Sequence, residues 1–231
     1  MNDARRFHSN MTMIGGTLSR RRILKMSAAV GALGAFSPIH SVLAQSFRRT
    51  QDQILGPFYP VTKAPDPSGD LTRVRDGTGR AKGQVLNVMG RVLNPAGEPV
   101  RGAKVEIWQA NAAGRYAHPD DPNPAPLDPN FEGFGLVTTD AEGRYRFKTI
   151  KPAAYPTGPT GMRLAHIHFE VVGQHDELVT QMYFEGDPYN EKDRHLQSAS
   201  RPEALIVKLR PATVEFEPDS MTAVFDIVIR G

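Results

Sequence analysis

The sequence predicts an all-β protein, an antiparallel β-sandwich with long loops that meet at one end. From about residue 83 onward, short apolar runs recur at regular spacing. Clusters of Gly, Pro, Asn and Asp separate these runs, and the chain holds 21 Gly and 19 Pro. A helical period of apolar residues is almost absent. Together these three observations indicate many short strands joined by turns.

The expected strands begin after residue 83 and are separated by turn signals. The segment 104–109 alternates polar and apolar residues, as a half-buried strand does. Turn clusters occupy 94–99, 140–143 and 173–176, and the last two predict hairpins. The segment 110–133 is a long loop rich in Asn, Asp and Pro, and loops of this length in a domain are usually functional or disordered. The expected strands are 85–92, 104–109, 136–139, 145–150, 166–172, 178–184, 206–209 and 222–229.

Two segments precede the β-sandwich domain, which we place at residues 81–231. Residues 1–44 resemble an export signal, because three arginines at 20–22 precede a short apolar run and 42–44 is typical of a cleavage site. The paired arginines resemble a twin-arginine signal, so we expect a periplasmic or extracellular protein. Residues 45–80 are interpreted as an N-terminal arm that packs across the domain or against a neighbouring subunit.

Composition excludes several functional classes. The chain has no cysteine, which rules out disulfides, zinc–thiolate sites, iron–sulfur clusters and thiol catalysis. The formal net charge is +3, but residues 1–44 hold six of the 28 basic residues and one of the 25 acidic residues. The remainder therefore carries a charge of −2, which does not favour nucleic-acid binding. The apolar run of the signal is too short for a stable membrane span.

The clearest chemical signal is the pair His166 and His168. On a strand, residues i and i+2 point to the same face, so the two imidazoles would lie side by side while Ile167 points into the core. Two imidazoles held in this way form half of a metal site. A His-x-His pair is a weak signal by itself, because most such pairs on strands are surface or hydrogen-bonded residues. His195 lies in a polar stretch and is expected to be solvated.

Further motifs surround this pair, and together they resemble the intradiol ring-cleavage dioxygenases, most closely the protocatechuate 3,4-dioxygenase type. The joint pattern runs from about residue 53 to residue 184 and is highly specific, although no single piece is. The motifs are Gly56-Pro57-Phe58-Tyr59, Trp108-Gln109-Ala110-Asn111 with Gly114-Arg115-Tyr116, Tyr155-Pro156, Arg163-x-x-His166-Ile167-His168-Phe169 and Thr180-Gln181-Met182-Tyr183-Phe184.

The resemblance implies one mononuclear non-haem Fe(III) ion. Its protein ligands would be Tyr116, Tyr155, His166 and His168, with Tyr155 and His168 axial and hydroxide as a fifth ligand. Phenolate and imidazole suit Fe(III) better than soft metals. A trivalent cation also stabilises the phenolate form of tyrosine, whose pKa is otherwise about 10.

The implied reaction is intradiol cleavage of a catechol-type aromatic diol by O₂, which gives a cis,cis-muconate-type product in aromatic compound catabolism. By resemblance, Tyr155 would act as a general base toward the substrate. The guanidinium of Arg163 would stabilise negative charge that develops on the ring. Gln181 would be a hydrogen-bond donor beside the iron or the substrate.

Two departures from the resemblance concern substrate and assembly. From the sequence we expect no helical N-terminal extension of the kind that dimerises the catechol-specific branch, so catechol itself is the less favoured substrate. An export signal points instead to an extracellular aromatic diol. Related enzymes form assemblies, and the arm at 45–80 would serve a homo-oligomer.

Two alternatives to a dioxygenase stay open at this point. The segment 90–105 resembles transthyretin-like β-sandwich modules, which bind without catalysis and need no Tyr/His cluster. A zinc hydrolase would use His166, His168 and His118, but it leaves both tyrosines unexplained and lacks an obvious general base.

Overall fold

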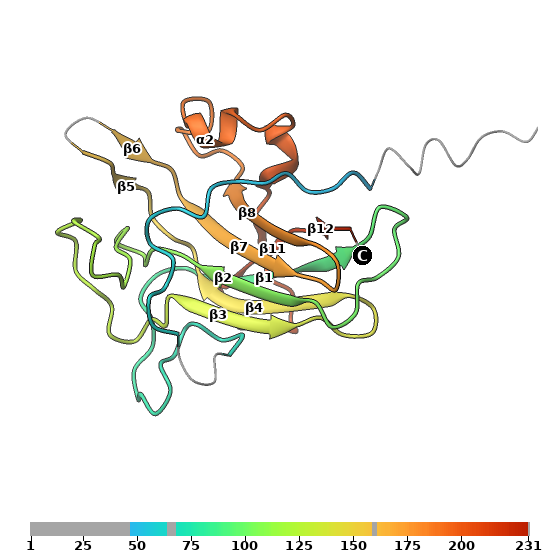
Figure 1. Ribbon diagram of the computed structural model, residues 1–231. Coiled ribbons are helices and arrows are strands. Elements are labelled where there is room, and N and C mark those ends of the chain that lie inside the picture. The colour runs from blue at the N-terminus through green and yellow to red at the C-terminus, as the bar shows by residue number, and fades with distance from the viewer. Residues whose placement is uncertain (1–46, 64–67, 159–160, 231) are drawn as a thin grey trace, which may run out of the picture. The chain divides into compact units, whose positions relative to one another are not determined.

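The computed structural model describes residues 47–63, 68–158 and 161–230 (Figure 1). The predicted export signal at 1–44 therefore lies outside the described residues. These ranges form two five-stranded sheets and one short hairpin. They contain no helix that is long and apolar enough to cross a membrane.

The first sheet is built around its longest strand, β1, and has the order β10-β11-β1-β12, with β4 also pairing with β1. β4 is antiparallel to β1, whereas β11 and β12 pair with it in parallel, one after the other along its length. Gly90 marks the change-over, because a Cβ there would stand 2.1 Å from the carbonyl oxygen of Phe225. The strands are β1 (Val85–Leu93), β4 (Arg144–Ile150), β10 (Arg210–Pro211), β11 (Met221–Val224) and β12 (Ile227–Val228).

The second sheet has the order β3-β2-β7-β8-β9, and the hairpin β5-β6 precedes β7 in the chain. Its first four strands are antiparallel, and β9 is parallel to β8. Two short helices, α2 (Arg194–Gln197) and η2 (Pro202–Leu205), lie between β8 and β9. The strands are β2 (Lys104–Trp108), β3 (Phe134–Thr138), β5 (Tyr155–Pro156), β6 (Met162–Arg163), β7 (His166–Val172), β8 (Glu177–Phe184) and β9 (Ile206–Val207).

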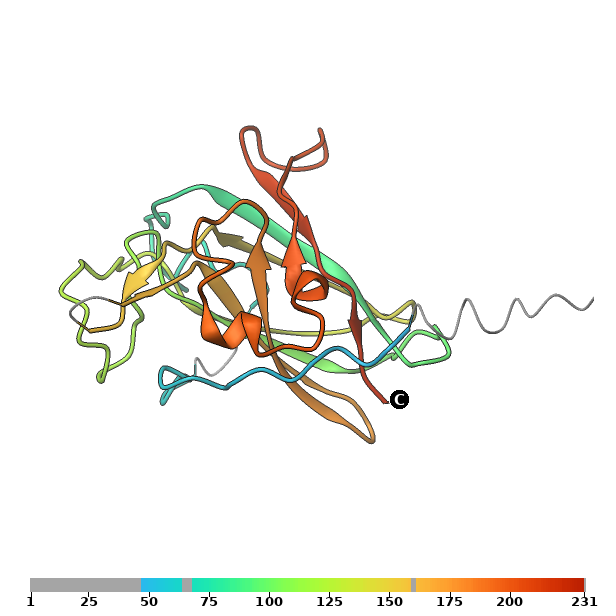
Figure 2. The same ribbon diagram turned by 90° about the horizontal axis from the view of Figure 1, so that it is seen from above.

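The predicted β-sandwich is confirmed, and the two sheets enclose one apolar core (Figures 1 and 2). The core contains inward-facing residues of both sheets, among them Val88 and Phe147 from the first and Ile107, Ile167 and Phe169 from the second. The expectation of purely antiparallel pairing was wrong for β9, β11 and β12. A parallel neighbour requires a crossover, and the segment with α2 and η2 supplies it between β8 and β9.

Residues 47–63 of the N-terminal arm cover the outer face of the second sheet (blue in Figures 1 and 2), whereas Leu71, later in the arm, is buried in the main core. The segment 47–63 first follows the edge of β8, where the Gln53 amide donates to the Val179 carbonyl at 2.8 Å. It then crosses toward β2, and Phe58 and Tyr59 pack on a second, smaller apolar cluster. The buried members of this cluster are Trp108, Ala110, Tyr116, Phe134 and Tyr155. The outer face of this sheet is therefore an interior of its own.

Candidate metal centre

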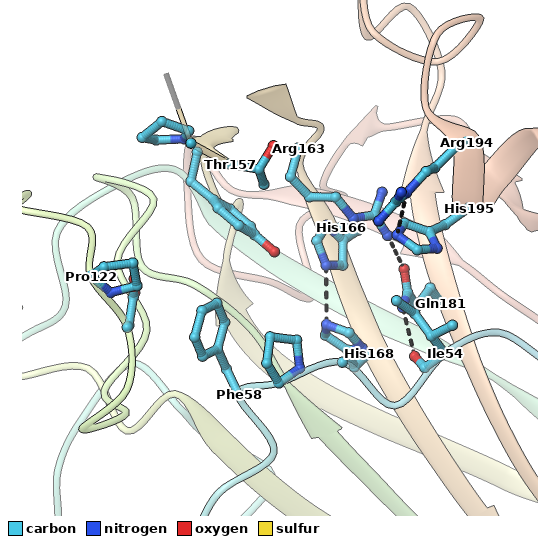
Figure 3. Close-up of a pocket in the computed structure, with 16 residues that line it drawn as sticks. Ile54, Phe58, Pro122, Thr157, Arg163, His166, His168, Gln181, Arg194 and His195 are labelled. Carbon is cyan, nitrogen blue, oxygen red and sulfur yellow. Dashed lines mark hydrogen bonds between the residues drawn. The ribbon is translucent and has the colours of Figure 1, made fainter. Parts of the chain in front are cut away.

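Strand β7 directs two histidines to the outer face of its sheet. Its alternation buries Ile167 completely in the core, while His166 and His168 point the other way, under the arm. Both imidazoles are almost fully buried, at 2 % and 4 % exposure. The Nε2 atom of His166 lies 3.0 Å from the Nε2 atom of His168, so the two potential donor atoms meet at one point (Figure 3).

The long loop between β2 and β3 brings Tyr116 to the same point. The Tyr116 Oη atom lies 3.3 Å from His166 Nε2. The loop is folded by its own polar side chains: Asn111 Oδ1 accepts from the amides of Ala113 and Arg115, and an Asp121 carboxylate oxygen accepts from the Tyr116 amide at 2.7 Å. The Asn- and Asp-rich composition of the loop therefore serves to fix the tyrosine.

Tyr155 enters from the hairpin β5-β6 and faces Tyr116. Their rings are 5.6 Å apart and perpendicular, and the ring of Tyr155 lies 5.9 Å from that of His166. Arg163 is the cross-strand partner of Tyr155 in this hairpin. A long loop and a short hairpin thus place two phenols beside two imidazoles. The structure brings together all four residues that the sequence analysis named as ligands.

Burial sets the protonation of this cluster. It lowers the pKa of His166 well below its usual value and that of His168 to about 3, with the charge of Arg163 acting in the same direction on both. Burial also raises the pKa of Tyr116 and of Tyr155. At neutral pH the cluster therefore holds two neutral imidazoles, which are ready as ligands, and two phenols that ionise only beside a strongly charged cation.

This donor set fits a hard, highly charged metal ion. Nδ1 of His166 donates a hydrogen bond to the Leu164 carbonyl at 2.7 Å. The proton of this imidazole is therefore on Nδ1, and the Nε2 atom presents its lone pair to the cluster as a potential metal ligand. Two phenols and two imidazoles suit Fe(III) in particular. In the part of the chain that the structure describes, no three His, Cys, Asp or Glu side chains gather as a metal site. Among these residues His118 thus forms no three-histidine cluster with His166 and His168, and its Nδ1 instead accepts from the Asp120 amide at 3.1 Å.

A buried polar network lies behind the cluster. Arg163, 6 % exposed, forms an ion pair with Asp193 and donates to Gln181 Oε1, and its Nη2 lies 3.3 Å from the hydroxyl of Tyr183. Gln181 Nε2 donates to the Ile54 carbonyl of the arm at 2.7 Å. The network thus fixes Arg163 in place and ties the arm to β8.

An open pocket of about 310 Å³ leads to the cluster (Figure 3). Tyr155, His166, His168, Arg163 and Gln181 all line it, whereas Tyr116 is not part of its wall. This volume is at the lower end of the range for small-molecule sites.

Residues that the sequence analysis placed elsewhere also line the pocket. Arg194 and His195 of α2 contribute to its wall. His195 is partly exposed, as expected, but it also faces the pocket, which was not expected. Asp193 caps α2 and pairs with Arg163, which folds this polar stretch back over the site. The arm adds Ile54, Gly56, Pro57 and Phe58, where only packing was expected. The Gly-Pro-Phe-Tyr motif was the available sequence signal for the arm, and the residues of α2 had none.

Comparison with known proteins identifies this arrangement. Residues 54–231 match the family model described as Dioxygenase. The chain is 48% identical over 191 residues to the protocatechuate 3,4-dioxygenase beta chain of Burkholderia cepacia, which covers 79% of this chain and 80% of that one. The chain belongs to the intradiol ring-cleavage dioxygenases. It therefore belongs to a family of oxidoreductases that use non-haem iron.

The chain covers only part of the length of several other members of the family. Catechol 1,2-dioxygenase of Acinetobacter baylyi is 39% identical over 158 residues, which are 62% of this chain and 49% of that enzyme. The chain thus spans about half the length of the catechol enzymes. The structure of catechol 1,2-dioxygenase from Acinetobacter sp. ADP1 superposes with a TM-score of 0.63 at 30% identity, covering 83% of this chain and 66% of that one. A dioxygenase domain of Streptomyces sp. SirexAA-E gives 0.61 at 28%, covering 79% and 99%.

Membership in this family decides between the remaining alternatives. A transthyretin-like binding module would share the sandwich but would not share these relatives, which are named as dioxygenases. The binding-module interpretation is therefore wrong.

Proposed function

We propose that this dioxygenase binds one Fe(III) ion and cleaves a catechol-type diol with O₂ between its two hydroxylated carbons, giving a cis,cis-muconate-type product. The convergence of four donor side chains, Tyr116, Tyr155, His166 and His168, at one buried point carries the proposal. Their chemistry matches a ferric ion, and the family uses non-haem iron.

The four donors would hold the ion, and the ion would supply the electron-withdrawing charge that activates a chelated diol toward O₂. Two phenolates and a hydroxide balance the charge of Fe(III) and so favour the ferric state. The neutral imidazoles add no charge of their own. Because the diol supplies the electrons that reduce O₂ and both oxygen atoms enter the product, the reaction needs no external reductant.

Two further side chains act on the substrate in this proposal. Tyr155 lies in the pocket wall, so its phenolate oxygen can accept a proton from a diol hydroxyl. Arg163 presents a permanent positive charge to the same pocket and stabilises anionic forms of the ring. Its ion pair with Asp193 fixes the guanidinium but also offsets part of its charge. Gln181 Nε2 donates to the Ile54 carbonyl of the arm, so this amide is not free to bind the substrate. Gln181 Oε1 accepts from Arg163 and thereby helps to position the guanidinium.

The pocket favours a diol whose ring bears an anionic substituent. Arg194 and His195 line its wall, and in the described structure Arg194 forms no ion pair with a carboxylate. The most similar of the relatives described above acts on protocatechuate, which meets this condition. We therefore rank carboxylated diols above catechol itself.

We further propose that the enzyme is exported through its twin-arginine-type signal, works on aromatic compounds outside the cytoplasm, and forms a homo-oligomer. The sequence at 1–44 supports export. Fractionation of cells that express the full chain, followed by light scattering on the mature protein, tests both points.

A visible absorption spectrum with an iron assay tests the central proposal. A broad band from tyrosinate-to-iron charge transfer, shifting to longer wavelength when a catechol is added without O₂, supports it. O₂ uptake across ring-substituted diols then ranks the substrates. A protein that stays colourless after reconstitution with ferric ion would overturn the iron site.

A further inference from the structure

The two histidines of the cluster are oriented by different means. His166 is fixed by a hydrogen bond, since its Nδ1 donates to the Leu164 carbonyl at 2.7 Å. His168 Nδ1 is buried and has no hydrogen-bond partner of normal geometry among the described residues. The Ile54 carbonyl faces this ring, but its oxygen accepts from Gln181 Nε2 at 2.7 Å. Metal-binding histidines usually donate their second N–H to a carbonyl or carboxylate, so His168 departs from the rule.

The indole of Trp108 takes the place of that hydrogen bond. Trp108 is the cross-strand neighbour of His168, and both side chains point to the outer face of the sheet. Their ring planes differ by only 9° and their centroids are 4.7 Å apart. The two rings are stacked in parallel, and a stack fixes the plane of an imidazole because any tilt loses contact area.

The indole is itself held by shape alone. Its Nε1 is buried without a hydrogen-bond partner in the described chain, so no polar contact orients it. The ring of Tyr59 meets it edge-on at 4.8 Å and 86°, and Phe134 is its neighbour on β3. The Tyr59 hydroxyl in turn donates to Glu106 and lies 2.8 Å from a Glu170 carboxylate oxygen. Tyr59 of the arm therefore packs against Trp108, and Trp108 packs against His168.

We propose that Trp108 is a positioning residue, whose indole face holds the His168 imidazole in the plane that metal binding requires. The inference rests on the proposed function, because it assigns to His168 a metal-binding role. It goes beyond the ligand set by naming what orients one ligand and by explaining why a large aromatic residue stands beside the site. Nothing in this role requires Trp108 to touch the substrate.

The test compares three variants of the mature protein. Trp108→Leu keeps an apolar side chain but removes the flat face. Trp108→Phe keeps a smaller aromatic face. Phe134→Leu is the matched control, since it removes a ring from the same apolar cluster without a ring contact to His168. The readouts are the retention of ferric ion against EDTA, the electron paramagnetic resonance spectrum of the bound ion, and the melting temperature.

We expect Trp108→Leu to lose ferric ion about 10- to 100-fold more readily than the wild type, with an altered resonance spectrum. Trp108→Phe should recover most of the affinity, and Phe134→Leu should lose melting temperature while keeping its iron. Equal iron retention in Trp108→Leu and Phe134→Leu at matched stability would overturn the proposal. A wild type that binds no ferric ion would instead overturn the proposed function, so the two failures are distinct.

Discussion

The two faces of β7 lie in two interiors that were built in different ways. On one face, Ile167 and Phe169 enter the core between the sheets, whose members come from strands that neighbour one another in the fold. On the other face, His166 and His168 lie in a smaller interior that exists only because the arm covers it. The first interior supplies stability, and the second gathers polar and titratable groups. Adjacent residues of β7 therefore contribute alternately to the stability of the fold and to the candidate metal site.

The largest expected effect is a contrast between two adjacent residues, His168, which would bind the metal, and Ile167, which stabilises the core. His168→Ala should lower ferric-ion binding and ring cleavage by at least about 100-fold, because removing a ligand costs more than removing its support. Its melting temperature should change little. Ile167→Ala should instead lose about 2–5 kcal/mol of unfolding free energy while its folded fraction keeps the visible band. Denaturation curves and iron assays on both variants check this, and a shared loss of both properties would break the comparison.

The buried ion pair behind the cluster sharpens the comparison next. Arg163→Met leaves Asp193 charged, buried and unpaired, which should cost about 3–5 kcal/mol of unfolding free energy as well as activity. Arg163→Met with Asp193→Asn removes the stranded charge but keeps the oxygen that caps α2. The double variant should recover most of the stability and little of the activity. Recovery of both would show that Arg163 serves only the fold.

The arm offers a smaller and well-controlled test. Gly56 has φ +78°, and a Cβ there would stand 3.0 Å from Cε1 of His168. Gly56→Ala should therefore cost about 1–2 kcal/mol from the backbone and also disturb the His168 ring. Gly102 has φ +76° with nothing within 4 Å of such a Cβ, so Gly102→Ala pays the backbone cost alone. Urea denaturation should show similar losses for both, while only Gly56→Ala alters the charge-transfer band.

The smallest effect is expected on the outer face of the first sheet. There Glu217 pairs with Lys148 at 2.9 Å, and hydrogen bonds from Arg80 and then Lys148 lower its pKa to about 2. Because the folded pKa is lowered, its stabilisation is present above about pH 4.5 and is lost as the pH falls toward 2. Glu217→Gln should cost at most about 1 kcal/mol at pH 7, progressively less as the pH falls below about 4.5, and nothing below about pH 2. Thermal unfolding of both proteins across this range measures it.

The contrast between the two interiors also explains what the sequence could predict. Alternation of apolar residues is a local signal, so most of the strands around the main core were found within a few residues of their observed ends. The single strand expected at 222–229 was wrong, because this segment forms two strands, β11 and β12, that pair one after the other with β1. The four candidate ligands were found only through motifs that resemble a known family. Neither alternation nor spacing links Tyr116 to His166, which lie 50 residues apart.

Contacts made by irregular segments had no such signal. Arg194 and His195 reach the pocket because Asp193 pairs with Arg163, 30 residues earlier in the chain. Tyr59 meets Glu170 across 111 residues. The parallel pairing of β1 with β11 likewise depends on the whole chain rather than on either segment. Long-range polar contacts and crossover pairings are set by tertiary structure, and local propensity does not encode them.

The stack of Trp108 on His168 has a practical consequence. The chain contains a single tryptophan, so all of its tryptophan fluorescence comes from Trp108, beside the site. A ferric ion bound at His168 would quench that emission by energy and electron transfer over a few ångströms. Titration of the colourless protein with ferric ion should therefore report occupancy directly by fluorescence, without substrate and without turnover. Trp108 is therefore an intrinsic fluorescent probe of metal binding at His168.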